Sequence, residues 1–313
     1  MTASAASGMD QWADWLLRRR HGDDADHLHA VEAAIRQHAD RVIDGAQLAP
    51  GMLLADLGSG DGAVALRAIE RVGAGLRVVV SDVSETLLRH AESAARQRGV
   101  IHQCRFLLAS VESLGEIASD SVDAVTLRAV LAYVPDKLAA IGEVFRILRP
   151  GGRLSIAEPI FQDDALEAAA LRRMLKDPGQ PAAANAGFLA VLHRWKAAQF
   201  PDTPDGIAAN PLTSHSERDL WRLIQAKGFG TLHMELHVDL RPALSRSWAA
   251  FLDSSPHPFA PSLGRILGEQ CSAEESRIFE DMMRPSVEAG QALSTDRVVY
   301  LTAQKPGLQA ASS

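Results

Sequence analysis

Between residues 52 and 157 the sequence alternates strand-length apolar runs with helical patterns, and no other feature constrains the fold as strongly. The apolar runs are Met52–Leu57, Leu76–Ser81, Cys104–Ala109, Val122–Leu127 and Arg153–Ala157. The helical patterns between them are Ala63–Val72, Ser84–Arg98 and Pro135–Leu148. Strands linked through helices predict βαβ units and a parallel sheet that is buried on both faces. Because such crossovers are right-handed, few topologies remain.

The segments outside this core predict helical additions and two further strands. Helices are expected over Asp10–Arg20, Asp26–Ala46, Asp164–Lys176, Asn185–Gln199 and Ser216–Gly228, and strands over Thr231–Leu240 and Arg297–Ala303. Residues 1–9 and the loop 177–181 predict no regular structure, and a Pro-rich connection runs from Phe200 to Pro211. The predicted domains are an N-terminal helical cap (1–50), a core (51–160), a helical insertion (161–215), the remainder of the core sheet (216–242 and 294–306), a second helical insertion (243–293) and a tail (307–313).

The composition of the 313-residue chain is that of a globular protein, with 47% hydrophobic and 23% charged residues. A formal net charge of −7 provides no basic field for a nucleic-acid backbone. No apolar run approaches the roughly eighteen residues of a membrane span, and the first ten residues lack a secretory pattern, so we expect a cytoplasmic enzyme. Cys104 and Cys271 are expected to be buried free thiols, and the basic run Arg18–His21 is expected to be a solvated helix end.

A glycine-rich loop, Asp56-Leu57-Gly58-Ser59-Gly60-Asp61-Gly62, ends the first predicted strand and directly precedes a helical pattern. Glycines at alternate positions permit a tight turn and let a ligand approach the backbone closely. Amides at the start of the following helix can bind a carboxylate. The sequence therefore predicts a ligand site at the end of this strand, although a structural turn with a capping Asp is the competing interpretation.

Three details of this region narrow the choice of ligand. The spacing G-x-G-x-G differs from the G-x-G-x-x-G of dinucleotide-binding proteins. Asp61 would place a negative charge where a pyrophosphate should lie, which Coulomb repulsion disfavours. Asp82 closes the second predicted strand, where a carboxylate can accept hydrogen bonds from both ribose hydroxyls. A ribose-containing ligand other than a dinucleotide is therefore favoured.

The order of motifs over residues 52–158 resembles that of the class I methyltransferases that use S-adenosylmethionine (SAM), particularly the small-molecule branch with the ubiquinone/menaquinone C-methyltransferases. The matching segments are Asp56–Gly62 for motif I, Ser81–Ser84 for the ribose-binding acid, Phe106–Leu114 for the third strand and adenine-flanking loop, Ser121–Asp136 for the fourth strand and the helix after it, and Arg149–Leu154 for the turn before the fifth strand. The resemblance implies an α/β, doubly wound, Rossmann-like sheet of seven strands, mostly parallel, with an antiparallel last strand.

The resemblance also implies roles toward SAM. The residues expected to bind SAM are Asp56, Gly58, Ser59, Gly60, Asp61, Gly62, Asp82, Val83, Ser110, Val111 and Arg128. Asp56 and the glycine loop would hold the methionine end, Asp82 the ribose, and Val83 would pack on the adenine. Ser110 stands where many members have Asp, so the Val111 amide is expected to share adenine recognition. Arg128 lies where family residues meet the methionine and the substrate.

Methyl transfer from a sulfonium is an in-line displacement with an activated donor, so alignment and desolvation supply most of the catalysis and a base is weakly specified. The predicted catalytic residues are Tyr133, Glu158 and His21; His193 and His215 are also of suitable type, with a structural role favoured for each. The predicted substrate contacts are Trp12, Trp15, Arg19 and Tyr133, because the family often folds N-terminal helices over its pocket. Core packing is an equally favoured interpretation of the tryptophans.

The predicted function is SAM-dependent methylation of a small-molecule acceptor. Leu127-Arg128-Ala129-Val130 stands where amino-methylating nucleic-acid enzymes keep an Asn-Pro-Pro-Tyr-type motif, and with the acidic charge this argues against DNA or RNA as acceptor. No tight Asp/Asn/His cluster indicates a metal. Two alternatives stay open, an NAD(P)-dependent oxidoreductase and a non-catalytic SAM-binding protein. A monomer and a homodimer both fit the sequence.

Overall fold

The computed structural model describes residues 9–176 and 185–307. Two compact units make up the chain. The sheet unit comprises Ala33–Gln162, Ala208–Asp239 and Thr295–Ser313, and the helical unit comprises Met1–Glu32, Asp163–Ile207 and Leu240–Ser294. The irregular segments predicted at 1–9, 177–181 and 307–313 lie outside the described residues except at positions 9 and 307.

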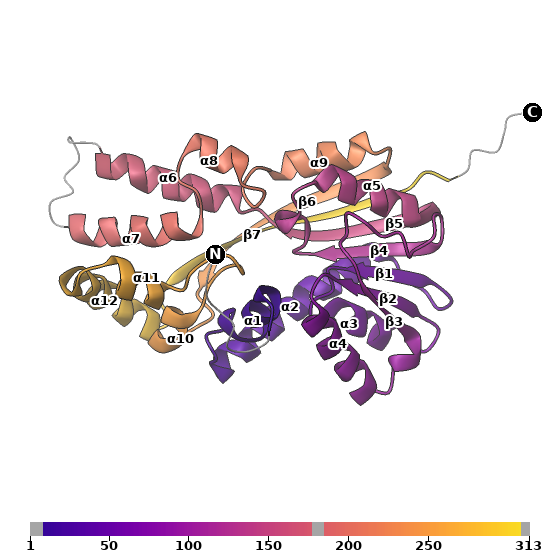
Figure 1. Ribbon diagram of the computed structural model, residues 1–313, viewed down its shortest axis with the longest axis horizontal. Coiled ribbons are helices and arrows are strands. Elements are labelled where there is room, and N and C mark those ends of the chain that lie inside the picture. Colours follow the sequence, from indigo (N-terminus) through magenta and orange to yellow (C-terminus); the bar gives the residue numbers. More distant parts are fainter. Residues whose placement is uncertain (1–8, 177–184, 308–313) are drawn as a thin grey trace, which may run out of the picture. The chain divides into compact units, whose positions relative to one another are not determined.

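The elements alternate as the apolar pattern predicts (Figure 1). The strands are β1 (Leu53–Leu57), β2 (Arg77–Asp82), β3 (Cys104–Leu108), β4 (Val122–Arg128), β5 (Leu148–Pro159), β6 (Gly230–Pro242) and β7 (Leu293–Gln304). The helices that begin in or flank the sheet unit are α2 (Ala25–Ala46), α3 (Ala63–Val72), α4 (Glu85–Gln97), η2 (Ile101–Gln103), η3 (Leu131–Tyr133), α5 (Lys137–Ile147) and α9 (Glu217–Ala226). The others are α1 (Gln11–Asp14), η1 (Trp15–Arg19), α6 (Gln162–Lys176), α7 (Ala186–Gln199), α8 (Pro204–Ala209), α10 (Trp248–Asp253), α11 (Leu263–Gln270) and α12 (Ala273–Glu288).

The seven strands form one sheet in the order β3-β2-β1-β4-β5-β7-β6. β1 pairs in parallel with β2 and β4, β2 with β3, and β4 with β5, whereas β7 runs antiparallel to β5. The predicted doubly wound, mostly parallel sheet of seven strands with an antiparallel end is therefore confirmed. Two strands that are far apart in sequence, β6 and β7, complete it on one side.

Both faces of the central strands are covered by helices. Leu54 and Val78 belong to an apolar cluster with α2, α3 and α4. Their neighbours Ala55 and Val79 belong to a second cluster with α5 and α9 on the opposite face (Figure 1). Because successive side chains of a strand point to opposite faces, strands covered on both sides are apolar at most positions. This explains the continuous apolar runs in the sequence.

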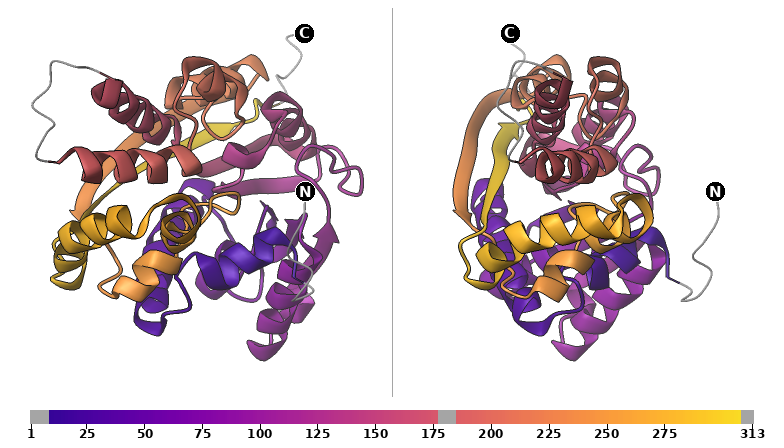
Figure 2. Two further views of the ribbon diagram at one scale, coloured as in Figure 1. Left: turned by 60° about the vertical axis from the view of Figure 1, so that its left-hand side comes forward. Right: turned by 90° about the vertical axis from the view of Figure 1, so that its left-hand side faces the viewer.

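The helical unit, whose helices are drawn in Figure 2, has an apolar core of its own according to its buried side chains. Val191 of α7, Trp248 of α10, Leu263 of α11 and Phe279 of α12 are all buried in this core. The ring of Phe279 stacks on Phe188 with a centroid distance of 5.3 Å. The residues come from segments that are far apart in sequence, so only the folded chain defines this core.

Two details of the fold differ from the sequence analysis. The Pro-rich connection contains the short helix α8, which begins at Pro204 and is capped by Thr203, whose Oγ1 accepts a hydrogen bond from the Gly206 amide at 3.1 Å. Pro is favoured at the first helical position after such a cap, so the signal was present in the sequence. Cys104 and Cys271 are free, as expected, but both are half-buried rather than buried.

Among the described residues, no helix is both long and apolar enough to cross a membrane.

Two leucines provide a test of the assigned core. Leu148 is 0% exposed between the sheet and its helices, whereas Leu138 on α5 is 48% exposed. Leu148→Ala should lower the free energy of unfolding by about 2–5 kcal/mol, because it removes buried methyl groups and leaves a cavity. The control Leu138→Ala should change it by less than about 1 kcal/mol. Denaturant unfolding followed by circular dichroism measures both, and equal effects would contradict this core.

Candidate active site

The carboxyl ends of β1, β2, β4 and β5 meet at one edge of the sheet. β1 lies between β2 and β4, so the strand order changes direction beside it, and ligands of open α/β sheets bind at such a switch point. Leu57 pairs with Ser81 of β2 and with Leu127 of β4. Asp82 and Arg128, the next residues of those strands, therefore emerge on either side of the loop that follows β1.

The glycine loop has the backbone that its sequence predicts. Gly58, Gly60 and Gly62 all have left-handed φ angles, of 62°, 57° and 81°. A Cβ at Gly58 would lie 2.5 Å from Cγ2 of Val130, which is closer than atoms can approach. Conformation and space therefore both require glycine at position 58. The loop leads directly into α3, with Gly62 at its N-cap.

Asp82 holds this loop in place. Its Oδ2 accepts a hydrogen bond from the Gly60 amide and its Oδ1 one from the Ser84 amide, each at 2.8 Å. The side chain is 7% exposed. An ionised carboxylate offers about four acceptor positions, so the chemistry of this group suits a ligand with two adjacent hydroxyls.

Two apolar side chains are exposed at neighbouring strand ends. Val83 directly follows β2 and is 51% exposed, and Leu108, the last residue of β3, is 56% exposed. Leu108 pairs with Asp82 in the sheet, so the two apolar residues lie at the same edge as the carboxylate. An aromatic base could pack on such a surface. The sequence analysis assigned no role to Leu108, although its place at the end of the third strand was the available signal.

Asp56 lies beneath the loop and is 1% exposed. Its Oδ1 accepts a hydrogen bond from Thr126 Oγ1 at 2.8 Å, and its Oδ2 accepts one from the Ala65 amide at 3.1 Å. Burial raises the pKa of Asp56 to about 7, although the hydrogen bond from Thr126 and the charge of Arg128 oppose this. The carboxyl group thus ties β1 to β4 and to the first turn of α3.

Glu158 holds the turn that follows β4 and is 0% exposed. Its carboxylate accepts hydrogen bonds from the amides of Val130 (2.8 Å), Leu131 (2.9 Å) and Ala132 (3.3 Å). Burial raises the pKa of Glu158 to about 7 against the effect of these amides. In the same turn Ala129 has a left-handed φ of 54°, a conformation that costs free energy for a residue with a Cβ. Glu158 therefore keeps a strained turn at the edge where ligands bind.

Two further loops contribute the remaining predicted residues of the sheet unit. Tyr133 ends η3, and its ring lies 6.3 Å from that of Phe161 between centroids. Ser110 Oγ accepts a hydrogen bond from the Glu112 amide at 3.2 Å, which shapes the loop after β3. Val111 is 6% exposed and belongs to the apolar core.

A half-buried lysine and a buried histidine lie close together in the sheet unit. Lys137 Nζ donates hydrogen bonds to the carbonyl oxygens of Val134 (2.9 Å) and Pro211 (2.8 Å). Burial lowers the pKa of Lys137. His215 is 4% exposed, and burial, with the charge of Lys137, lowers its pKa to about 4. The His215 imidazole is therefore neutral at pH 7. The sequence analysis had missed Lys137.

The basic run in the helical unit is only in part the solvated helix end that its sequence predicts, because Arg18 is exposed whereas Arg19 and His21 are packed. Arg19 donates hydrogen bonds to the carbonyl oxygens of Pro258 (2.9 Å) and Ala260 (3.1 Å) and to Asp14 Oδ2 (2.8 Å). His21 is 5% exposed. The loop before α11 supplies these carbonyl groups, and no periodicity in the sequence indicates where that loop lies.

The two N-terminal tryptophans also contact this loop within the helical unit. Trp15 Nε1 donates a hydrogen bond to the Ser255 carbonyl oxygen at 2.9 Å. Trp12 packs edge-on against Phe259, with ring centroids 5.4 Å apart. Both side chains therefore have packing roles there. The predicted substrate contacts of Trp12, Trp15 and Arg19 and the predicted catalytic role of His21 stay predictions.

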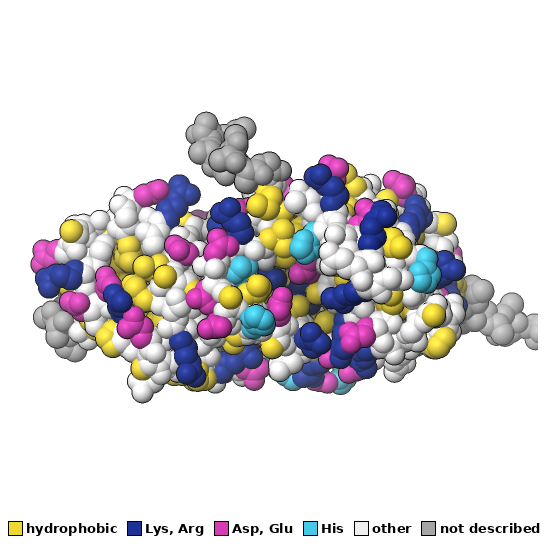
Figure 3. Space-filling model, turned by 90° about the horizontal axis from the view of Figure 1, so that it is seen from below, with side chains coloured by type: hydrophobic (Ala, Val, Ile, Leu, Met, Phe, Trp, Pro, Cys, Tyr) yellow, Lys and Arg dark blue, Asp and Glu magenta, His cyan; other side chains and the backbone are white. Residues whose placement is uncertain are grey.

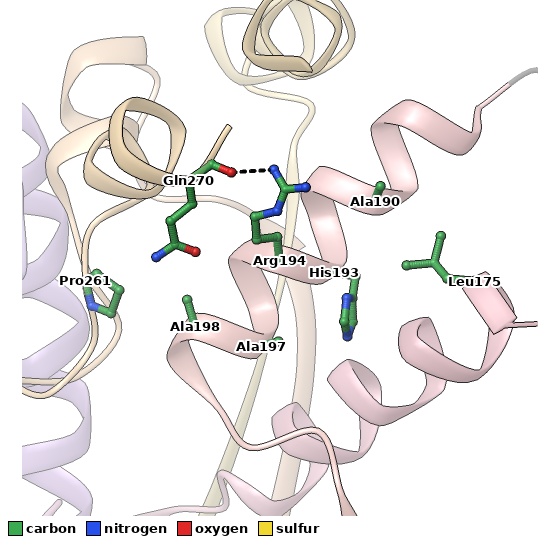
Figure 4. Close-up of a pocket in the computed structure, with 8 residues that line it drawn as sticks. All are labelled: Leu175, Ala190, His193, Arg194, Ala197, Ala198, Pro261 and Gln270. Carbon is green, nitrogen blue, oxygen red and sulfur yellow. Dashed lines mark hydrogen bonds between the residues drawn. The ribbon is translucent and has the colours of Figure 1, made fainter. Parts of the chain in front are cut away.

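The helical unit contains a pocket of about 610 Å³ between α6, α7 and α11 (Figure 4). It is lined by Leu175, Ala190, His193, Arg194, Ala197, Ala198, Pro261 and Gln270. His193 Nε2 lies 2.9 Å from Asp202 Oδ2, and Arg172 Nη1 lies 3.3 Å from Oδ1 of the same carboxylate. Arg194 is bound to the Gln270 carbonyl oxygen at 2.7 Å. The pocket thus combines small apolar side chains with one oriented imidazole.

The strand order, the glycine loop after β1 and the acid at the end of β2 have the arrangement that the resemblance in the sequence implied. Residues 48–192 match the family model described as a methyltransferase domain. The match covers less than half of the chain and agrees with the resemblance seen in the sequence.

The curated relatives are methyltransferases with different acceptors. The chain is 33% identical over 116 residues to the ubiquinone/menaquinone biosynthesis C-methyltransferase UbiE of Idiomarina loihiensis, covering 37% of this chain and 46% of that one. It is 30% identical over 148 residues to the tRNA 5-carboxymethoxyuridine methyltransferase of Escherichia coli, covering 47% and 54%. The chain thus spans about half the length of the curated relatives it matches. Among solved structures, the YcgJ protein from Bacillus subtilis has the same fold, with a TM-score of 0.54, 17% identity and coverage of 86% of this chain and 99% of that one.

The burial of Glu158 predicts a specific pH dependence of stability. Its pKa is about 7 in the folded chain, above the ordinary value of 4.5, so ionisation is more costly in the folded state. The folded state is therefore favoured as pH falls from 7 to 4.5 and loses this contribution as pH rises again. Relative to Glu158→Gln, the wild type should gain on the order of 3 kcal/mol of unfolding free energy between pH 8 and pH 4.5.

Denaturant unfolding of both proteins at several pH values measures this difference. Glu116→Gln is the matched control, because that side chain is 69% exposed. The difference in unfolding free energy between this control and the wild type should stay nearly constant with pH. A constant difference for Glu158→Gln as well would rule out the buried, high-pKa carboxyl group.

Proposed function

We propose that this chain is a SAM-dependent methyltransferase that transfers a methyl group to a small-molecule acceptor. One arrangement carries the proposal: a glycine loop with three left-handed residues at the switch point, bonded to the buried carboxylate of Asp82. A ligand that carries a ribose and a charged amino-acid end fits this arrangement, because one carboxylate and several backbone amides meet there. The match to a methyltransferase domain favours SAM over a dinucleotide.

Residues of the sheet unit would hold the two ends of SAM. Asp82 would accept hydrogen bonds from the ribose hydroxyls, and Val83 and Leu108 would flank the adenine. The backbone of Gly58–Gly62 and the side chain of Arg128 would face the methionine end. When bound, SAM supplies a methyl group on a positively charged sulfur, which needs no further activation. This fit supports SAM as cofactor, because backbone amides, a carboxylate and apolar side chains follow one another as the methionine, ribose and adenine of SAM do.

Catalysis in this scheme depends mainly on alignment. Asp56 and Glu158 act as positioning residues, because their carboxyl groups hold the loop after β1 and the turn after β4 rather than a substrate. An acceptor fixed in line with the methyl group and shielded from water gains most of the required rate. Tyr133, at the end of the turn held by Glu158, is the residue we assign to contact the acceptor.

The charge distribution favours a small acceptor over a nucleic acid. The net charge is −7, and on the face drawn in Figure 3 Lys and Arg side chains are interspersed with Asp and Glu. A nucleic-acid backbone is bound by basic surfaces of one sign. The tRNA methyltransferase among the relatives makes tRNA the alternative acceptor to be tested.

Cofactor binding is the first test. Titration calorimetry with S-adenosylhomocysteine should give micromolar affinity, and NADH should give no heat of binding. Asp82→Asn should weaken the binding of S-adenosylhomocysteine by about 10-fold to 100-fold, because the hydrogen bonds from the ribose to a charged acceptor are lost. Asp44→Asn is the control, since that carboxylate is 64% exposed, and it should bind like the wild type. Binding of NADH, or of neither ligand, would overturn the proposal.

Methyl transfer separates an enzyme from a non-catalytic SAM-binding protein. Incubation with methyl-labelled SAM should transfer label to a small-molecule fraction of a cell extract and not to tRNA. Tyr133→Phe should lower the rate by about 100-fold or more if the phenol moves a proton, with S-adenosylhomocysteine affinity unchanged. Label in tRNA would show that the acceptor is a nucleic acid rather than a small molecule. An unchanged rate for Tyr133→Phe would show that Tyr133 has no part in the mechanism.

A further inference from the structure

β6 is a long strand at the end of the sheet. It comprises the 13 residues Gly230–Pro242, more than twice the usual strand length of about 5–6 residues. In the strand order it has β7 on one side and, among the described residues, no strand on the other (Figure 2). Its outer edge thus presents a row of backbone groups to which another strand could bind.

One face of β6 changes from covered to exposed along the strand. Leu232 and Met234 are half-buried and pack against the apolar core of the sheet unit. Leu236, Val238 and Leu240 continue the same face, because side chains alternate, yet they are 45%, 56% and 66% exposed. A long edge strand with an exposed apolar face can pair with a strand of another molecule. The only proline of β6 is Pro242, its last residue.

The opposite face of the same stretch carries charges of both signs. Glu235, His237, Asp239 and Arg241 alternate with the exposed apolar residues. Within the chain, Glu235 binds Arg41 Nη2 at 2.5 Å and His237 Nε2 at 3.0 Å. The charges of this face thus already form one pair with α2 and one within β6.

The sequence of β6 is self-complementary when two copies run antiparallel with Val238 opposite Val238. Leu236 of one copy then faces Leu240 of the other. On the charged face, Glu235 faces Arg241, and His237 faces Asp239. Apolar pairs and pairs of opposite charge directly across antiparallel strands stabilise a sheet. A single register therefore matches both faces of the strand.

Neighbouring registers are less favourable. With His237 at the centre, Glu235 would face Asp239, and with Asp239 at the centre, that carboxylate would face its own copy. Like charges directly opposite destabilise a sheet. A register centred on Leu236 avoids this but uses the half-buried Leu232 and Met234 in place of the exposed end of the strand.

We propose that β6 is the dimer interface of this protein, pairing antiparallel with β6 of a second copy about a two-fold axis at Val238. The pairing joins the two sheets into one and covers both free edges. A two-fold axis makes each contact occur twice, as in other isologous dimers. This inference does not depend on the methyltransferase activity.

Disulfide trapping tests the register. In a Cys104→Ala, Cys271→Ala background, Val238→Cys should form a covalent dimer on mild oxidation, because opposite Cα atoms lie about 4.5–5.5 Å apart. Leu236→Cys is the matched control on the same face, since the two Leu236 residues would be about 13 Å apart along the strands. Non-reducing electrophoresis reads both out. Any pattern other than a link at 238 without one at 236 overturns the register.

Solution measurements test the interface without cysteines. Sedimentation equilibrium should give a dimer for the full chain. Val238→Lys adds charge to the edge, so its dimer dissociation constant should be at least about tenfold higher. Leu138→Lys, at a side chain 48% exposed on α5, should leave the dimer unchanged. Glu235→Arg and Arg241→Glu should each weaken the dimer, and the double variant should restore it. A wild-type monomer up to high micromolar concentration, or no restoration by the double variant, overturns the proposal.

Discussion

Buried carboxyl groups must be satisfied by hydrogen bonds, and this constraint organises the edge of the sheet where the site lies. Asp56, Asp82 and Glu158 are 1%, 7% and 0% exposed, and each accepts hydrogen bonds from backbone amides. The amides belong to α3, to the glycine loop and to the turn after β4. Moving a charged group from water into the protein interior costs free energy unless hydrogen-bond donors of the protein replace the water. The buried carboxyl groups need these amides as donors, and they therefore hold the loops at this edge in one conformation.

The same interactions explain how a strained loop persists. Ala129 has a φ of 54° and lies beside three amides that bind Glu158. The free energy lost in the strained residue is offset by the hydrogen bonds that these amides donate to Glu158. A turn held in this way presents Arg128 and Tyr133 in a fixed arrangement. Pre-organisation of this kind is what a displacement with an activated donor requires.

The long strand β6 shows a second constraint, on how the sheet ends. A parallel core is protected by helices on both faces, but its last strands are antiparallel. Within the described part of the chain, no strand pairs with the outer edge of β6. Natural sheets commonly protect such an edge with lysine, proline or a short strand. β6 instead alternates apolar residues with charges of both signs, a pattern that excludes misaligned partners and admits a correctly aligned copy. Solubility and association are then set by the same residues.

The sequence by itself determined the sheet and the glycine loop, because both depend on local patterns. Apolar runs separated by helical periodicity predict buried strands, and Gly58 stands where no other residue fits. It also located Asp82, which follows a strand that the pattern predicts. The tertiary structure alone decided the partners of Arg19, the pairing of Lys137 with the Pro211 carbonyl, and the use of the Glu158 carboxylate for backbone amides. These contacts join residues far apart in the chain, and no periodicity encodes which buried donor meets which acceptor.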